Sequence, residues 1–191
     1  FNTLNAISTL VLDRDNATAN RMVQGLSAFL RHSLDADPMQ RVTLKQELDA
    51  IGLYLDIEKT RFAERLRVDV EVEPTCWQAL LPSLLLQPLV ENAIKYSVVK
   101  RVEGGMIGLR AVREGDYLKL SVIDDGPGWP ELEQGGMPTD STPRGTRVGL
   151  ANTRDRLSVL YGVRQNFELR NRSEGGFAVT MTLPFEIEGM P

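Results

Sequence analysis

The sequence predicts an α+β chain in which a helical N-terminal segment is followed by a mixed sheet with helices on one face. Up to about residue 64, apolar residues recur at steps of three and four, which is the period of an amphipathic helix. From Leu66 onward they alternate with polar residues, which is the period of a half-buried strand. We therefore expect two units, residues 1–64 and residues 65–191.

The first unit is expected to contain three amphipathic helices. The first two cover about residues 3–12 and 17–35, and the polar cluster 13–16 can end one and cap the other. Thr43 and Gln46 form a capping-box pattern ahead of the third. Such long apolar stripes cannot all be buried within so short a piece, so they predict packing against each other and against a second copy of the chain. A helical bundle that completes a monomeric core is the alternative.

The second unit is expected to contain five strands and two helices. The strands fall at residues 66–72, 106–112, 117–123, 167–170 and 177–183, and the helices at about 82–98 and 149–161. Pro82 suits a first helical turn, whereas Pro88 removes an interior hydrogen bond, so we expect a bend or a broken first turn at Pro88.

Composition limits the possible partners and location. The chain has 191 residues, 42% of them hydrophobic, and a formal net charge of -4, which argues against a nucleic-acid or anionic-membrane surface. A single cysteine, Cys76, excludes an internal disulfide and fits a reducing compartment. Because no run approaches roughly 20 apolar residues, we expect this piece to be cytoplasmic without membrane contact. The abrupt start at Phe1 suggests a fragment of a longer polypeptide.

The first candidate site residues lie in segment 84–96. If it is a helix, its leucines form an apolar flank, and Glu91, Asn92 and Lys95 face a cleft together. An amide oxygen that can bind a hard cation, with a lysine one turn away for anionic oxygen, is half of a metal-nucleotide site. A solvated outer face is the alternative.

The second candidate is the strand end 122–128. A carboxylate there, Asp124, can accept a hydrogen bond from an exocyclic amine, and Gly126 and Gly128 let a flat ring approach the backbone. An acidic β-turn is the alternative.

The third candidate is the glycine-containing segment 145–150, which precedes a helix. Backbone N–H groups at a helix start form an anion site when glycine exposes them. Residues 131–144, rich in Gly and Pro, predict a mobile loop that can act as a lid. Each motif is weak alone, but all three in this order indicate a nucleotide site.

With these motifs the chain resembles the GHKL (Bergerat) ATP-binding superfamily of gyrases, chaperones, mismatch-repair proteins and sensor histidine kinases. Residues 91–96 are similar to its N box, 124–128 to its G1 box and 145–150 to its G2 box. More narrowly, residues 1–5, 54–62 and 86–93 resemble LytS/AlgZ-type sensor histidine kinases, so the likeness covers nearly the whole chain.

The resemblance implies ATP and Mg²⁺ as ligands. It implies that Asn92 binds Mg²⁺, that Lys95 and Tyr96 contact phosphate or the lid, and that Asp124 takes the adenine amino group. Glu91 would be an acidic helper near metal or water. The remaining implied contacts are Gly126 and Gly128 around adenine, Gly145, Thr146, Arg147, Val148, Gly149 and Leu150 around the phosphates, and Thr180 behind adenine. Arg147 departs from the family by replacing the middle glycine of the G2 box.

The implied function is the kinase core of a two-component sensor histidine kinase. It would form a homodimer through its N-terminal helices and transfer the γ-phosphoryl group to a histidine upstream of Phe1, and then to a response regulator. The parent protein is expected to be anchored in the inner membrane upstream of this cytoplasmic piece. We expect His32 to have a structural or surface role, so this chain should bind ATP without phosphorylating itself.

Two other functions stay open. A GHKL ATPase that drives a conformational cycle normally carries an acid one turn before the metal-binding Asn, but here that position is Pro88, which cannot act as a base. A non-catalytic dimeric module of the same fold is the other alternative, favoured by Arg147 and opposed by Asn92, Lys95 and Asp124.

Overall fold

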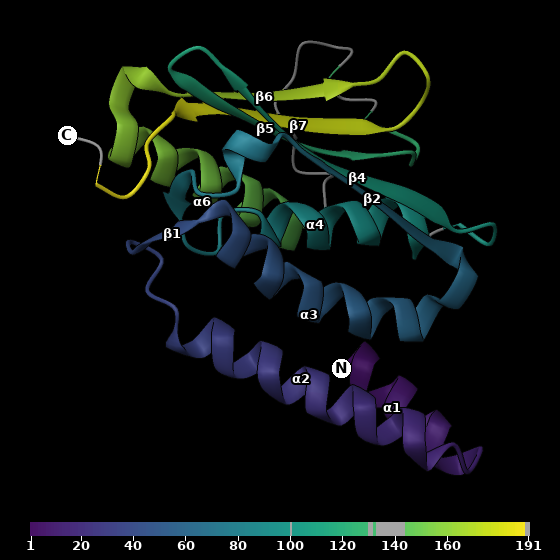
Figure 1. The fold of residues 1–191 in the computed structure, drawn as a ribbon. Coiled ribbons are helices and arrows are strands. Elements are labelled where there is room, and N and C mark those ends of the chain that lie inside the picture. The colour runs from purple at the N-terminus through teal and green to yellow at the C-terminus, as the bar shows by residue number, and fades with distance from the viewer. Residues whose placement is uncertain (100, 130–131, 133–143, 190–191) are drawn as a thin grey trace.

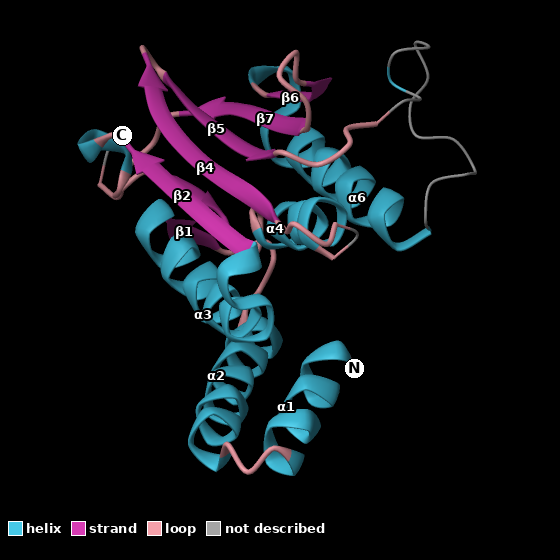
Figure 2. Ribbon diagram, turned by 90° about the vertical axis from the view of Figure 1, so that its right-hand side faces the viewer, coloured by secondary structure: helices cyan, strands magenta, loops and turns pink. Residues whose placement is uncertain are grey.

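A computed structural model describes residues 1–99, 101–129, 132 and 144–189, and only the backbone of residues 144–148. Its N-terminal part consists of helices α1 (Asn2–Leu12), α2 (Asn16–Asp35) and α3 (Leu44–Phe62). The predicted caps are confirmed: Asp15 accepts from the Thr18 N–H, and Thr43 and Gln46 form both bonds of a capping box. In Figures 1 and 2, α1 and α2 extend away from the sheet, and α3 lies between α2 and the sheet.

A five-stranded mixed sheet forms the other part of the molecule. Its strands are β2 (Leu66–Val72), β4 (Gly105–Glu114), β5 (Tyr117–Asp124), β6 (Asn166–Asn171) and β7 (Phe177–Pro184). Their order is β2-β4-β5-β7-β6; β2 and β4 are parallel, and the other neighbours are antiparallel. All five predicted strands are confirmed.

One face of this sheet is covered by helices α3, α4 (Gln87–Ala93) and α6 (Arg144–Tyr161), as Figure 1 shows. Strand β5 alternates buried and less buried positions, with Leu118, Leu120 and Val122 facing these helices. The expected fold class, a helical segment followed by a mixed sheet with helices on one face, is therefore confirmed.

The expected start of the helix at 82–98 is wrong. Pro82 ends a short strand, β3 (Leu80–Pro82), which pairs with β1 (Arg41–Thr43); three-residue strands show no alternation that a sequence could reveal. Leu84 then adopts a φ of 58, which lies outside the range of a right-handed helix, and α4 begins only at Gln87. Pro88 consequently lies in the first turn, where its missing N–H is not needed, rather than at a bend.

Two further boundaries differ from expectation. Helix α4 continues as a π-helical turn, Ile94–Val98, a feature often found at functional sites. Helix α6 begins at Arg144 rather than near residue 149, so the glycine-containing segment forms its first turns. The expected lid, residues 131–144, lies almost wholly outside the described residues.

The helical part keeps much apolar surface exposed. Helix α1 has no buried residue, and α2 buries only Ala19 and Met22. The exposed apolar side chains of the two helices include Leu4, Val11, Leu12, Val23, Leu30 and Leu34. In the described part of the chain, no helix combines the length and apolar character that a membrane crossing requires.

Candidate functional site

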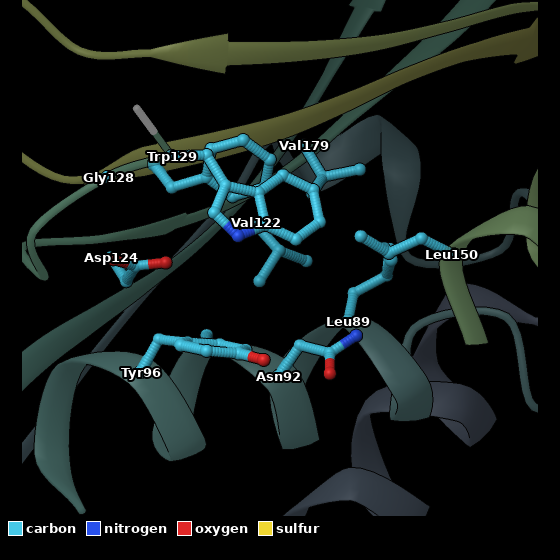
Figure 3. Close-up of a pocket in the computed structure, with 11 residues that line it drawn as sticks. Leu89, Asn92, Tyr96, Val122, Asp124, Gly128, Trp129, Leu150 and Val179 are labelled. Carbon is cyan, nitrogen blue, oxygen red and sulfur yellow. The ribbon is translucent and has the colours of Figure 1, made fainter. Parts of the chain in front are cut away.

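A pocket lies between helix α4 and the sheet (Figure 3). Its lining comes from α4, β5, the turn after β5, α6 and β7, and consists of Leu89, Asn92, Ala93, Tyr96, Val122, Asp124, Gly128, Trp129, Leu150, Phe177 and Val179. Five expected site residues are among them: Asn92, Tyr96, Asp124, Gly128 and Leu150. Segments that are distant in the sequence therefore meet around a single cavity.

Asp124 forms one end of the pocket, at the last position of β5. The residue is only 5% exposed, and its Oδ1 accepts the backbone N–H of Gly126 at 2.8 Å. Burial raises the pKa of the Asp124 carboxyl to about 6, although hydrogen bonds from the N–H groups of Gly126 and Phe177 act in the opposite direction. The group is thus a desolvated acceptor that faces the cavity (Figure 3).

Two glycines preserve the geometry of this end. A Cβ at Gly126 would lie 2.8 Å from Asp124 Oδ1 and would push the carboxylate away. Gly128 has φ 72, and a Cβ there would lie 2.9 Å from Asn171 Oδ1. Glycine is therefore required at both positions for the turn to stay close to the carboxylate.

An aromatic pair forms the wall beside Asp124. The rings of Trp129 and Phe177 have centroids 5.0 Å apart and are tilted by 60°. Asn171 fixes the Trp129 backbone from both sides, accepting its N–H at 2.6 Å and donating to its C=O at 2.7 Å. Sequence reasoning missed both aromatic residues; the alternation of β7, which puts Phe177 and Val179 on one face, could have found Phe177.

The α4 side of the pocket follows helical spacing. Leu89, Asn92 and Tyr96 are three and four residues apart, which places them on one face. In Figure 3 the Tyr96 ring lies between Asp124 and the amide of Asn92. A Cβ on Gly149 would lie 3.9 Å from Asn92 Nδ2 and 3.6 Å from Pro88 Cβ, so the start of α6 approaches α4 at the Asn92 end.

Among the described residues, five expected ones are not in the pocket lining: Glu91, Lys95, Gly126, Gly149 and Thr180. Exposed Glu91 accepts from Gln87 Nε2, one turn earlier on α4, at 2.8 Å. Lys95 Nζ lies 5.4 Å from the centroid of the Tyr96 ring. Thr180 is on the opposite face of β7, where its Oγ1 is 3.2 Å from Ser121 Oγ.

Strand alternation puts Phe177 and Val179 of β7 on the pocket side, whereas Thr180 lies on the other face of the strand. The side chains of residues 145–148, which include Thr146 and Arg147, lie outside the described residues. His32 lies in α2, away from the pocket lining, and its buried Nε2 has no hydrogen-bond partner among the described residues.

Two family models match the chain. The family described as histidine kinase-, DNA gyrase B-, and HSP90-like ATPase matches residues 78–187, and the histidine kinase family matches residues 1–66. The chain belongs to the first of these families, whose match covers the pocket and most of the sheet.

Curated relatives make the assignment narrower. The sensor protein LytS of Staphylococcus epidermidis is 32% identical over 188 residues, which cover 97% of this chain and 32% of that protein. The sensor histidine kinase BtsS of Escherichia coli K12 is 41% identical over 125 residues, which cover 65% of this chain and 22% of that protein. The resemblance to LytS-type sensor histidine kinases is thus confirmed, and the chain spans about a third of the length of the LytS relative.

Solved structures share the fold. The catalytic domain of histidine kinase ThkA superposes with a TM-score of 0.59 at 19% identity, covering 76% of this chain and 95% of that chain. Full-length ShkA, solved in complex with AMPPNP, gives a TM-score of 0.57 at 20% identity, covering 96% of this chain and 40% of that chain.

Proposed function

We propose that this chain is the ATP-binding and dimerisation core of a two-component sensor histidine kinase. The observation that carries the proposal is that the Asp124 carboxylate and the Asn92 amide open onto the same pocket, with an aromatic wall between β7 and the turn after β5. A purine needs a flat apolar slot with one acceptor at its end, and the metal-bound phosphates need a polar end nearby. The pocket offers both.

Adenine would occupy the Asp124 end. A buried carboxylate accepts from the exocyclic amino group, while Trp129, Phe177 and Tyr96 supply apolar surface for the ring. Gly126 and Gly128 keep the carboxylate and the turn in place. The AMPPNP complex of ShkA, which shares this fold, supports the choice of an adenine nucleotide.

The phosphates and Mg²⁺ would occupy the Asn92 end. Among the described residues, no group of three or more His, Cys, Asp or Glu could hold a metal ion. Mg²⁺ would accordingly take one ligand from Asn92 and the others from phosphate and water, and would neutralise charge on the transferred phosphoryl group. Lys95 and the segment Gly145 to Leu150 are the proposed further phosphate contacts.

The chain's own residues favour phosphoryl transfer to protein over hydrolysis. A hydrolase needs an acid that activates water beside the phosphates. Pro88 occupies the position one turn before Asn92, and Glu91 is not among the residues that line the pocket. Among the described lining residues Asp124 is the one acid, and it lies at the adenine end.

We further propose that two copies pair through α1 and α2. The exposed apolar residues of these helices repeat at helical intervals, such as Val23, Leu30 and Leu34, and a second copy would bury them. In this proposal residues 1–64 form the dimerisation and phosphotransfer unit and residues 65–191 the ATP-binding unit. The acceptor histidine lies upstream of Phe1 in a membrane-anchored parent protein, and a response regulator takes the phosphoryl group from it.

Nucleotide titration tests the proposal most directly. Isothermal titration with Mg-ATP and Mg-ADP should show binding at micromolar to millimolar concentrations; an absence of heat at millimolar nucleotide, with the protein folded, would remove both the kinase and the ATPase hypotheses. The kinase is then separated from the ATPase with the longer polypeptide that includes the residues ahead of Phe1. Acid-labile phosphate on the protein supports a kinase, whereas rapid release of free phosphate without phosphoprotein supports a hydrolase.

The role of Asn92 has its own test. Asn92→Ala should weaken Mg-ATP binding by up to about 100-fold, because a metal ligand is lost, and should leave binding in EDTA nearly unchanged. Titrations with and without EDTA measure both effects. An equal loss under the two conditions would contradict the metal role.

A further inference from the structure

Glu47 is a buried carboxylate that lies outside the pocket. It is on the first turn of α3 and is only 2% exposed. Its Oε2 accepts the backbone N–H of Leu84, and its Oε1 accepts that of Leu86, both at 2.9 Å. A buried carboxylate is tolerated when each oxygen has such a donor, so the two bonds explain how Glu47 is accommodated in the core.

These two bonds hold the start of α4. Leu86 is the N-cap of α4, and its C=O accepts the first helical bonds from Leu89 and Val90 at 3.1 and 3.0 Å. Leu86 has no capping side chain of its own. A glutamate normally reaches back to the N–H of its own helix's N-cap, but here it is supplied by a different helix.

The same short segment is strained and is held from a second side. Leu84 has φ 58, a left-handed conformation that needs support in a residue with a side chain. Arg156 of α6 donates from Nη1 to Ser83 O at 3.0 Å. Burial raises the pKa of Glu47, while the N–H groups of Leu86 and Leu84 and the charge of Arg156 act in the opposite direction.

The held segment leads directly into the pocket. Helix α4 carries Leu89 and Asn92 on its pocket face, the π-helical turn that continues it carries Tyr96, and α6 carries Leu150. A rotation or shift at residues 83–86 would therefore move the amide of Asn92 relative to Asp124, which is fixed on β5. Contacts of this kind transmit small displacements because packed elements move as units.

We propose that Glu47 is a positioning residue that caps α4 from α3 and so couples the helical segment to the nucleotide pocket. The inference rests on the proposed function, since it assigns a route by which the helical segment controls the proposed ATP site. Helix α3 packs on α2, where Phe29 and Tyr54 have ring centroids 5.4 Å apart. A change in α2 thus reaches Asn92 through α3, Glu47 and the start of α4.

The test compares two buried glutamates of the same helix. In Glu47→Gln one oxygen becomes an NH₂ group that faces a backbone N–H, so at least one of the two bonds is lost. Mg-ATP affinity should fall about tenfold, because the competent position of α4 becomes a minority state. Glu58→Gln is the matched control: Glu58 is 3% exposed, but its partner is Arg61 on α3 itself, at 3.0 Å.

A second measurement follows the two hydrogen bonds that Glu47 accepts at the start of α4. Amide hydrogen exchange resolved at Leu84 and Leu86 should slow about tenfold when Mg-ATP binds to the unaltered protein, because a coupled cap opens less often when the pocket is filled. In Glu47→Gln both amides should exchange fast with or without nucleotide. A purely structural glutamate would give the same exchange rates in the free and bound protein.

The outcomes distinguish a failure of the Glu47 positioning role from a failure of the proposed ATP binding. Equal Mg-ATP affinity of Glu47→Gln and the unaltered protein, or equal loss in Glu58→Gln, would overturn the positioning role while leaving ATP binding intact. If Glu47→Gln does not fold, amide exchange at Leu84 and Leu86 in the unaltered protein tests the coupling by itself. Exchange rates that are the same with and without Mg-ATP would then overturn the coupling. Failure of the unaltered protein to bind nucleotide would instead overturn the proposed function and the coupling with it.

Discussion

Helix α2 and strand β5 both carry apolar residues at the spacing that their geometry requires, but they are buried to very different degrees. Strand β5 buries four of its eight residues, whereas α2 buries two of twenty. The sheet and the helices that cover it complete a core within the chain, while α2 presents an apolar stripe to solvent. Regular spacing therefore predicts an element, but it does not show whether the partner is in the same chain.

The largest expected effect is a loss of stability when a residue of the sheet core is truncated. Leu120→Ala should lower the free energy of unfolding by about 3 kcal/mol, because Leu120 is 1% exposed and its removal leaves a cavity. Denaturant unfolding of dilute protein measures this loss. The control Leu34→Ala, at a site that is 82% exposed, should change stability by no more than about 0.5 kcal/mol under those conditions. Similar losses in both variants would contradict the contrast.

The second largest effect is expected on self-association through the exposed apolar stripe of α2, which consists of Val23, Leu30 and Leu34. Leu30→Glu should weaken self-association about 100-fold, because a charge would be buried in an apolar interface. Sedimentation equilibrium over a range of concentrations measures it. Gln24→Glu adds the same charge on an exposed position of the same helix beside the stripe and should have a small effect. An unaltered protein that stays monomeric at all concentrations would refute the dimer.

A smaller effect is expected inside the pocket. Asp124→Asn should weaken Mg-ATP binding about 10- to 100-fold, because an acceptor for the adenine amino group becomes a mixed donor and acceptor. Isothermal titration gives the affinity, and a thermal melt checks that the fold is intact. Asp125→Asn is the neighbouring control, since Asp125 Oδ1 accepts from the Met106 N–H at 2.8 Å and does not line the pocket. Unchanged affinity in Asp124→Asn would refute the adenine placement.

The smallest effect is a pH dependence. Burial raises the pKa of Asp124 to about 6, so below that pH the carboxylate is protonated and one of its acceptor oxygens becomes a donor; ATP affinity should therefore fall about tenfold between pH 7.5 and pH 5. Asp124→Asn corrects for protonation of the nucleotide and should lack this part of the pH profile.

The stability of the nucleotide-free protein should show the opposite trend. The folded pKa of Asp124 is above its ordinary value of 3.8, so its contribution to stability is present below about pH 4 and is lost as pH rises through about 6. Thermal melts of the unaltered protein and Asp124→Asn across this range would test the sign. Parallel melting curves would contradict the shift.

Elements with local signals were predictable from the sequence. The Thr43 capping box and the alternation from Leu66 to Val72 involve neighbours in the chain, and the structure has α3 and β2 where these patterns predicted them. The start of α4 was not predictable, because Pro82 satisfies the rules for a first helical turn as well as Pro88 does. What decides between them is the pairing of Leu80–Pro82 with Arg41–Thr43, a contact between distant segments.

The residues of the pocket likewise divide into those that the sequence predicted and those that it did not. Its polar ends, Asn92 and Asp124, belong to motifs of a few consecutive residues, so the order of the motifs indicated a nucleotide site. Trp129 and Phe177 meet only because β7 pairs with β5, and Thr180 faces away for the same reason. Glu47 gave no sequence signal at all, since a glutamate on a helix is ordinary until its partners are known.

By itself the sequence determined the three N-terminal helices, the five strands of the large sheet, the family, and Asn92 and Asp124 of the candidate site, because local spacing and short motifs fix these. Only the tertiary structure decided which side chains wall the pocket, which expected residues do not line it and which helix caps α4. Those properties depend on distances between residues far apart in the chain, and folding sets these distances through the packing of the whole core.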